Sequence, residues 1–564
     1  MNKLPFLLFL LLVSCSAQSS KAIVDNEPDW SLHSVKLSAY PKADIRIDNG
    51  SKIVSIELPY GEKLGESTIE IVPAGGISTT PKTGEKVNLN NFKTIYLSAE
   101  GGKAARFGVT VTVLPSSSTA FSTLTEDNYR VKAWSAEGNF SFRFPHGADL
   151  KHLSFTTDAK EGLHFNPDIK DIDLTSAREV TVTAPDGKTN RKIYLEADHF
   201  PQDAGVRGVY LPSPNHTGSF LSYSEICKSM DLLSNLHFNC LFVCAWAGSR
   251  VAWDSQVLLE NSTWTTRAAG NMYASYTGGS GDALKDIIEV AHSRGIKVIL
   301  WFEYGFMHGI GGVNTTDPVL ARHPEWIGIN SNGAPCNYND TDFYLNGYDP
   351  EVQDFMMNLM KEALELYPEV DGIQGDDRLP AMPHNAGYDE KTKAKYLAET
   401  GKAVPTNDND SDWERWRLNE LNAFAKRMHT ELKAIKPSLV VCFAPNKYPW
   451  CQNVLMQEWP QWISDGAVDL LTVQCYVIAK YKEDVSATLG YVKERTDAPL
   501  FNPAMILKNG DTVLSVDKLA EQLQFNREVG TFGESQFWFD GLKDPAVQEL
   551  FKLYYPTPLA FPER

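Results

Sequence analysis

The sequence predicts a (β/α)8 barrel, of the TIM-barrel class, preceded by two all-β sandwich-like modules. Eight apolar runs rich in β-branched residues recur after residue 205, and helical patterns separate most of them. Because strands that alternate with helices form parallel sheets, eight such units over roughly 350 residues predict a closed barrel. Before residue 200, short alternating runs lie between turns rich in Gly, Pro and Asn, which is typical of β-sandwiches.

The first residues have the pattern of an export signal. Asn2 and Lys3 precede an apolar run over 4–13, which is too short to span a bilayer. The run ends in Leu12-Val13-Ser14-Cys15, which resembles a bacterial lipobox. We therefore expect Cys15 to be lipidated and residues 1–29 to form a signal peptide and tether. The alternative is an ordinary cleaved signal with a chance cysteine.

That signal predicts a location at the bacterial cell envelope. The lipid anchor would hold the protein on the outer membrane, facing the periplasm or the outside, and would be its one contact with the membrane.

Residues 30–114 and 123–200 form the two predicted β modules. Leu58-Pro59-Tyr60-Gly61 recurs as Phe144-Pro145-His146-Gly147, and Val87-Asn88-Leu89 recurs as Ile172-Asp173-Leu174. Both copies then end in a β-rich run. Matched segments in the same order predict that the second module repeats the first.

The barrel is predicted over residues 205–564. The predicted strands are Val209–Pro212, Cys240–Trp246, Lys297–Glu303, Gly372–Asp376, Leu439–Ala444, Leu470–Tyr476, Leu500–Ile506 and Ser535–Phe539. Helical patterns between them include Asp282–Ser293, Val352–Leu366 and Trp413–Ile435.

Composition narrows the class of partner and cofactor. The net charge of −18 disfavours nucleic acid as a partner. An odd number of cysteines after Cys15, without CxxC pairs, disfavours a disulfide framework or a zinc ribbon. No DxDxDG loop or HExxH motif is present, so we expect no metal. The lack of a GxSxG motif, a Walker A loop and a dinucleotide fingerprint disfavours the common esterases, ATPases and dehydrogenases, and we expect no cofactor.

Acidic and aromatic side chains follow several predicted strands. In a barrel the C-terminal ends of the strands meet at one rim, which carries the active site. The candidate catalytic carboxylates are Glu303, Asp376, Asp377, Glu458 and Asp540. The candidate substrate-binding residues are Trp301, Tyr304, Arg378, Asn446, Trp459, Gln474, Tyr476 and Trp538.

Paired carboxyl groups at one rim predict hydrolysis of a glycosidic bond. One carboxylic acid donates a proton to the leaving oxygen, and a second carboxylate attacks the sugar or activates water. Asp376 is the main candidate because it ends an apolar strand within a cluster of acids; Glu303 and Asp377 are candidates for the second acid. The alternatives are a helix cap for Asp377 and an ion pair with Arg378 for Glu303.

Residues 205–542 resemble the barrels of the glycosyl hydrolase-like family ten, a bacterial group. Arg207-Gly208-Val209-Tyr210 is similar to the family's opening RGVWL, and Val370–Asp377 resembles its VDGIxxDD. The other matching segments are Asp282–Val298, Trp301–Phe306, His323–Trp326 and Gln457–Tyr476.

The resemblance implies a glycosidase-like barrel that acts on bacterial or dietary polysaccharide. Val370–Asp377 also resembles the fourth strand of the α-amylase superfamily, which by analogy makes Asp376 a nucleophile or base. Two residues depart from the family pattern. Gly375 replaces a bulky apolar residue, so we expect a wider pocket, and Glu458 replaces the usual Asp.

The predicted function is therefore hydrolysis of an oligo- or polysaccharide at the cell envelope. One alternative is a non-catalytic surface glycan-binding lipoprotein, in which the acids only accept hydrogen bonds from sugar hydroxyls. The other is a metal-dependent carbohydrate esterase on the same barrel.

Overall fold

The computed structural model describes residues 27–114, 117–159, 162–200, 204–217, 219–308, 317–337 and 343–563. Cys15 and nearly all of the predicted signal peptide and tether lie outside the described residues. No helix of the described part has both the length and the apolar character that crossing a membrane requires.

The chain separates into two compact units. One comprises Met1–Phe121, Ala159–Phe165 and Thr181–Arg191, and the other comprises Ser122–Asp158, Asn166–Val180 and Lys192–Arg564. The predicted domain boundaries are not tested by this division and stay a prediction.

The first β region forms two sheets around its own apolar core. One sheet has the order β2-β3-β8-β7-β5 and the other has the order β1-β4-β6. Its core includes Val54, Ile56 and Leu97, all fully or almost fully buried. The strands are β1 (Leu32–Leu37), β2 (Asp44–Asp48), β3 (Ile53–Leu58), β4 (Glu66–Pro73), β5 (Ser78–Thr80), β6 (Lys86–Asn88), β7 (Thr94–Ser98) and β8 (Ala104–Val113).

The second β region has sheets of the orders β11-β15-β14-β13 and β10-β9-β12. In it β11 pairs with β15 in parallel, as β3 pairs with β8 in the first region. The two regions share this parallel pair, and the internal repeat stays a prediction. The strands are β9 (Thr123–Glu126), β10 (Lys132–Trp134), β11 (Asn139–Phe144), β12 (Phe155–Thr157), β13 (His164–Asn166), β14 (Arg178–Thr183) and β15 (Asn190–His199).

The rest of the chain is a (β/α)8 barrel, as predicted. Its sheet has the order β25-β24-β23-β20-β17-β16-β29-β26, and parallel bridges from Leu471 to Phe501 and from Gln474 to Ala504 join the two outer strands. The strands are β16 (Val206–Leu211), β17 (Cys240–Cys244), β20 (Lys297–Phe302), β23 (Gly372–Gly375), β24 (Val440–Phe443), β25 (Leu470–Leu471), β26 (Ala504–Ile506) and β29 (Gly533–Phe537).

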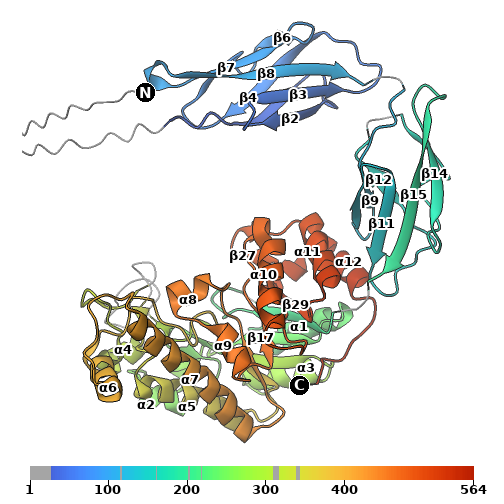
Figure 1. The fold of residues 1–564 in the computed structure, drawn as a ribbon. Helices are drawn as coiled ribbons and strands as arrows, with labels where there is room; N and C mark the ends of the chain where they lie inside the picture. The colour runs from blue at the N-terminus through green and yellow to red at the C-terminus, as the bar shows by residue number, and fades with distance from the viewer. Residues whose placement is uncertain are drawn as a thin grey trace, which may run out of the picture. The chain divides into compact units, whose positions relative to one another are not determined.

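Helices follow the barrel strands, and every helix labelled in Figure 1 belongs to this part of the chain. Three predicted helices begin at acidic N-caps, since Asp282, Asp349 and Asp410 accept backbone N–H groups of the first turn. The α-helices are α1 (Tyr223–Asn235), α2 (Gln256–Glu260), α3 (Ala283–His292), α4 (Pro318–Arg322), α5 (Pro350–Leu366), α6 (Glu390–Thr400), α7 (Ser411–Ile435), α8 (Trp450–Leu455), α9 (Trp459–Ser464), α10 (Tyr481–Lys493), α11 (Val516–Val529) and α12 (Pro545–Tyr554).

Short antiparallel pairs lie in three loops that leave the barrel strands. They are β18 (Trp246–Ala247) with β19 (Arg250–Val251), β21 (Met307–His308) with β22 (Phe343–Tyr344), and β27 (Lys508–Asn509) with β28 (Thr512–Val513).

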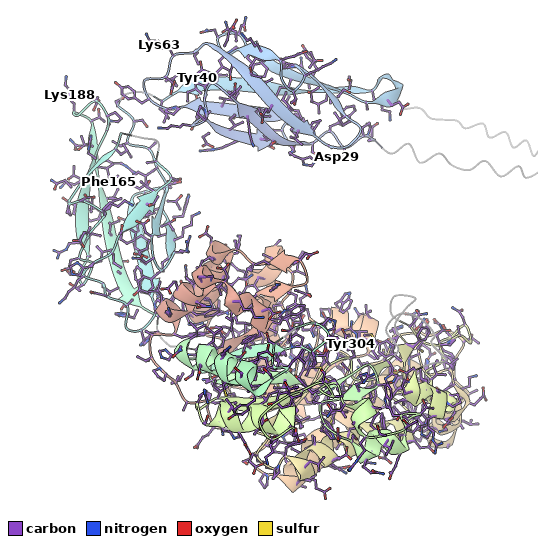
Figure 2. All side chains as sticks on the ribbon, turned by 180° about the vertical axis from the view of Figure 1, so that it is seen from behind. Asp29, Tyr40, Lys63, Phe165, Lys188 and Tyr304 are labelled. Carbon is purple, nitrogen blue, oxygen red and sulfur yellow. The ribbon has the colours of Figure 1, made fainter. Side chains whose placement is uncertain are left out.

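Two layers of side chains stabilise the barrel. A large apolar layer packs between strands and helices, and a smaller cluster that includes Tyr210, Phe242, Trp301 and Cys442 fills the space inside the strands. Side chains occupy the space between the ribbons throughout, and Tyr304 marks the loop after β20 (Figure 2). The seven cysteines of the described residues are free, and all but Cys227 are buried.

Candidate active site

The loops that leave β20 and β23 lie directly against each other. The backbone N–H of Phe306 donates to the carbonyl of Arg378 at 3.0 Å. A Cβ on Gly305 would lie 2.4 Å from that same oxygen, so only glycine permits this close approach. The indole N–H of Trp246 donates to the Gly305 carbonyl at 2.9 Å and fixes the loop from the other side. The ends of the third and fourth strands are thereby held together.

This contact brings Glu303 and Asp376 to neighbouring positions. In the parallel pair of β20 and β23, Trp301 is opposite Gln374 and Phe302 is opposite Gly375. The next position on each strand is Glu303 and Asp376. Because side chains alternate between faces, both follow Trp301 and Gln374 toward the barrel interior. The sequence predicted these two acids at one rim, and the register makes them the residues that directly follow two adjacent strands, close enough for the charge of Asp376 to act on Glu303.

Glu303 lies in a poorly solvated position. Its side chain is 7% exposed, and the thiol of Cys244, on β17, donates to Oε2 at 3.2 Å. Burial raises the pKa of Glu303 to about 8, the negative charge of Asp376 adds to the rise, and the Cys244 hydrogen bond opposes it. Near neutral pH this carboxyl group therefore holds its proton.

Asp376 is buried as well but has more polar partners. The amide of Gln474, beyond β25, donates to Oδ1 at 2.8 Å. Burial raises the pKa of Asp376 to about 7, while the charge of Arg378, the side chains of Trp301 and Gln474 and the backbone N–H of Tyr304 oppose the rise. These partners favour the ionised form of Asp376, whereas the thiol on Glu303 is a weaker donor.

Asp377 faces a different set of groups from Asp376, as the alternation of side chains predicted. It forms an ion pair with Arg378, and the amide of Asn446 donates to its Oδ2 at 2.7 Å. These contacts link the loops that follow the fourth and fifth strands. Asp377 is thus placed to hold Arg378 and Asn446 beside the acidic pair.

Aromatic rings line the interior next to the two acids. Trp301 packs edge-on against Tyr210 with ring centroids 5.0 Å apart, and Tyr476 lies 4.9 Å from Phe537. Trp538 follows Phe537, is 9% exposed, and its centroid lies 5.4 Å from that of Phe537. The predicted residues Trp301, Tyr476 and Trp538 therefore belong to one aromatic cluster.

Glu458 and Trp459 are engaged elsewhere. The Glu458 carboxylate accepts hydrogen bonds from Arg415 at 2.7 Å and from Asn422 at 2.8 Å, both on α7. Trp459 is fully buried, and its indole N–H donates to the carbonyl of Asn446 at 3.2 Å. Glu458 therefore connects the start of α9 to α7, and Trp459 holds the Asn446 loop through its indole hydrogen bond.

Asp540 lies in the short 3-10 helix Phe539–Lys543 that follows β29. Its carboxylate accepts from Thr217 at 3.0 Å and forms an ion pair with Lys543 at 2.7 Å. These partners tie the loops of the eighth and first strands together.

The expectation that Gly375 widens the pocket is wrong. A Cβ at this position would lie 2.4 Å from the carbonyl oxygen of Leu379 and 2.9 Å from the Phe443 ring. Glycine stands there because the loop after β23 folds back onto the strand, and no extra space is created.

Three residues of the site were missed from the sequence. Cys244 contacts Glu303, Tyr210 contributes to the aromatic cluster, and Gln374 donates to Thr472 at 2.8 Å beneath the acids. Gln374 carried a usable signal, because it precedes Asp376 by two residues and so shares its face. Among the described residues no group of three or more His, Cys, Asp or Glu side chains is arranged to hold a metal ion.

Comparisons with known proteins identify sequence relatives of this chain. The family model for Glycosyl hydrolase-like 10 matches residues 205–496. The chain is 28% identical over 390 residues to the glycosyl hydrolase DigH of Escherichia coli (strain K12), covering 61% of this chain and 81% of that protein. It is 25% identical over 215 residues to the glycosyl hydrolase YngK of Bacillus subtilis (strain 168), covering 35% and 39%. Among solved structures, the PgaB (BpsB) glycoside hydrolase domain from Bordetella bronchiseptica aligns with a TM-score of 0.43 and 11% identity, covering 63% of this chain and 99% of that chain.

Proposed function

The chain belongs to the glycosyl hydrolase-like 10 family, and on that premise we propose that its barrel hydrolyses a glycosidic bond with Glu303 and Asp376 as the two catalytic groups. The observation that supports this proposal is the buried pair itself, two neighbouring carboxyl groups whose pKa values are both raised by burial but whose hydrogen-bond partners differ. Environments that separate the pKa values of two acids also separate their roles.

Glu303 is the proton donor in this proposal. Its pKa of about 8 keeps it protonated at neutral pH, so it can protonate the oxygen of the leaving sugar. Asp376 is the group that acts as a carboxylate, because the charge of Arg378 and the Gln474 amide stabilise its negative charge. It either attacks the anomeric carbon or activates a water molecule.

The neighbouring side chains would bind the sugar. The aromatic cluster around Trp538 and Tyr476 supplies apolar surface for the ring faces, and Tyr304 adds a further ring beside Glu303. Arg378 and Asn446, both held by Asp377, would bind hydroxyl groups. The substrate class that follows is an oligo- or polysaccharide.

The test is reducing-end release from a panel of glycans, comprising denuded peptidoglycan strands, glycosaminoglycans, and plant and microbial polysaccharides. The wild type is compared with Asp376→Asn and with Asp412→Asn, which changes an exposed carboxylate that pairs with Lys402 on the surface. We expect release by the wild type and by Asp412→Asn, and loss with Asp376→Asn. No release from any glycan, together with binding to one of them, would favour a non-catalytic glycan-binding protein.

We also propose attachment to the cell envelope through Cys15, on the support of the lipobox-like sequence alone. Metabolic labelling with an alkyne fatty acid should mark the wild type but not Cys15→Ser, and the variant should leave the membrane fraction. Equal labelling of both proteins would contradict the anchor.

A further inference from the structure

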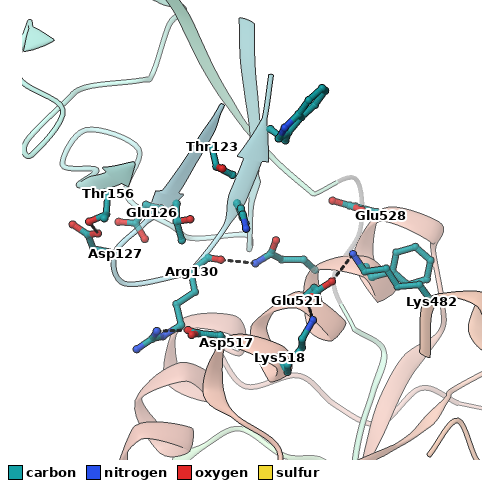
Figure 3. Close-up of a pocket in the computed structure, with 15 residues that line it drawn as sticks. Thr123, Glu126, Asp127, Arg130, Thr156, Lys482, Asp517, Lys518, Glu521 and Glu528 are labelled. Carbon is teal, nitrogen blue, oxygen red and sulfur yellow. Dashed lines mark hydrogen bonds and ion pairs between the residues drawn. The ribbon is translucent and has the colours of Figure 1, made fainter. Parts of the chain in front are cut away.

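A cavity lies away from the acidic pair, within the compact unit that contains β9, β10 and the barrel helices. Its volume is about 1040 Å³. Residues of β9 and β10 line one side, and residues of α10 and α11 line the other (Figure 3). None of the residues that line it belongs to the strand-end loops that carry Glu303 and Asp376.

An ion pair and hydrogen bonds join the two sides of the cavity. Arg130 forms an ion pair with Asp517 of α11, and the amide of Gln524 donates to the Arg130 carbonyl at 3.2 Å (Figure 3). The hydroxyl of Tyr554 donates to the carbonyl of Tyr129 at 2.9 Å. The cavity is therefore defined by specific contacts and does not depend on surface packing alone.

Most of the charged groups in the cavity already have partners. Glu521 pairs with Lys482 at 3.0 Å and with Lys518 at 2.7 Å. The buried carboxylate of Glu126 accepts the backbone N–H groups of Asn128 and Tyr129. Because these charged groups are already paired or hydrogen-bonded, they offer little net charge to an ionic ligand.

Among the described residues, a smaller set of groups in the same cavity has no hydrogen-bond or ion-pair partner. Trp134 is 68% exposed, the largest value among the exposed large apolar side chains of the described residues. Lys132 precedes it by two residues on β10 and so shares its face. Thr125 lies opposite Lys132 on β9, and Glu528 faces them from α11. Within the described part of the chain, the Thr125, Lys132 and Glu528 side chains make no hydrogen bond or ion pair.

These groups match the surface of a sugar. A pyranose ring presents an apolar C–H face and a rim of hydroxyl groups that both donate and accept hydrogen bonds. The exposed indole suits the apolar face, while an ammonium group, a hydroxyl and a carboxylate suit the rim. The unpaired ammonium of Lys132 and the unpaired carboxylate of Glu528 balance in charge, which favours an uncharged stretch of glycan.

We propose that this cavity is a non-catalytic binding site for a segment of the glycan that the barrel cleaves. The proposal rests on the proposed function for its ligand class, but the site itself takes no part in the reaction. Holding a polymer at a second site raises its effective concentration at the first. The site should therefore affect the use of long glycans and leave short soluble ones unaffected.

Affinity electrophoresis tests the site without requiring turnover. Asp376→Asn, which should not cleave the probe, is run through gels containing glycol chitin, hyaluronan, xyloglucan or pullulan. We expect at least one uncharged glycan to retard this protein, and Trp134→Ala in the same background to weaken the retardation roughly tenfold or more. Trp134→Tyr keeps an aromatic ring and should retain part of it. Tyr96→Ala removes another exposed aromatic side chain, outside the cavity, and should change nothing.

The outcomes separate the two proposals. Retardation that survives Trp134→Ala, or no retardation in any gel, would overturn the second site whatever the hydrolysis assay shows. Retardation that depends on Trp134 while the wild type releases no reducing ends would support the second site and count against the proposed hydrolysis. In the active protein, Trp134→Ala should raise the KM for the polymer and leave kcat on a short oligosaccharide unchanged.

Discussion

The raised pKa of Glu303 predicts that replacing it with glutamine stabilises the fold. The pKa rises from an ordinary value of 4.5 to about 8 in the folded state, and a rise of this size corresponds to roughly 5 kcal/mol. Because the folded protein binds this proton more tightly than the unfolded chain, the stability that the group contributes is complete below pH 4.5. It is lost progressively up to about pH 8.

Glutamine is neutral at every pH and avoids this loss. Glu303→Gln should therefore gain less than about 1 kcal/mol near pH 5 and up to roughly 5 kcal/mol above pH 8. Thermal unfolding followed by intrinsic fluorescence at several pH values measures the effect. We expect an increase in Tm of several degrees at pH 9 and almost none at pH 5.

Glu431→Gln is the matched control for this experiment. Burial favours a higher pKa for Glu431, but hydrogen bonds from Arg427 and Lys361 outweigh it and hold the pKa below its ordinary value. Its replacement should lower Tm at neutral pH and give no gain at pH 9. A Glu303→Gln variant that is no more stable than the wild type at pH 9, or equally more stable at pH 5 and pH 9, would refute a buried, protonated Glu303.

The other predictions concern activity and loop packing. If Glu303 must be protonated and Asp376 ionised, kcat should decline below about pH 7 and above about pH 8, and a profile flat from pH 5 to 10 would contradict these roles. Glu303→Gln should lose much less activity on an aryl glycoside with a good leaving group than on an oligosaccharide, and equal losses would argue against a proton donor. Gly305→Ala should reduce Tm by more than Gly401→Ala and also reduce activity, because the new Cβ meets the Arg378 carbonyl while Gly401 has open space around it. Similar effects from the two substitutions would show that the loop contact does not matter.

The barrel was predictable because its signals are local. Each of the eight apolar runs forms a strand. The sixth, β25, is shorter than predicted and covers only Leu470–Leu471. The helix predicted over Asp282–Ser293 is Ala283–His292, with Asp282 as its N-cap. Periodicity and capping residues are properties of neighbouring positions, so the sequence displays them directly.

The site was predictable only in part, because its details depend on distant residues. Glu303 and Asp376 followed from strand ends, a rule that applies to any such barrel. The partners of Glu458 are Arg415 and Asn422, on a helix whose packing against α9 no local pattern reveals. The role of Cys244 depends on the register between β17 and β20, which is set by the whole sheet. Gly375 was misjudged because the loop that occupies its space is folded back from Leu379.

The most direct test of the central claim is a double-mutant cycle of Glu303→Gln and Asp376→Asn, read out as reducing-end release from a glycan that the wild type cleaves. Two groups that act in one chemical step are not additive, so we predict that each single variant loses on the order of 10³-fold and that the double variant loses little more. Single variants with nearly wild-type rates, or losses that multiply in the double variant, would contradict catalysis by this pair.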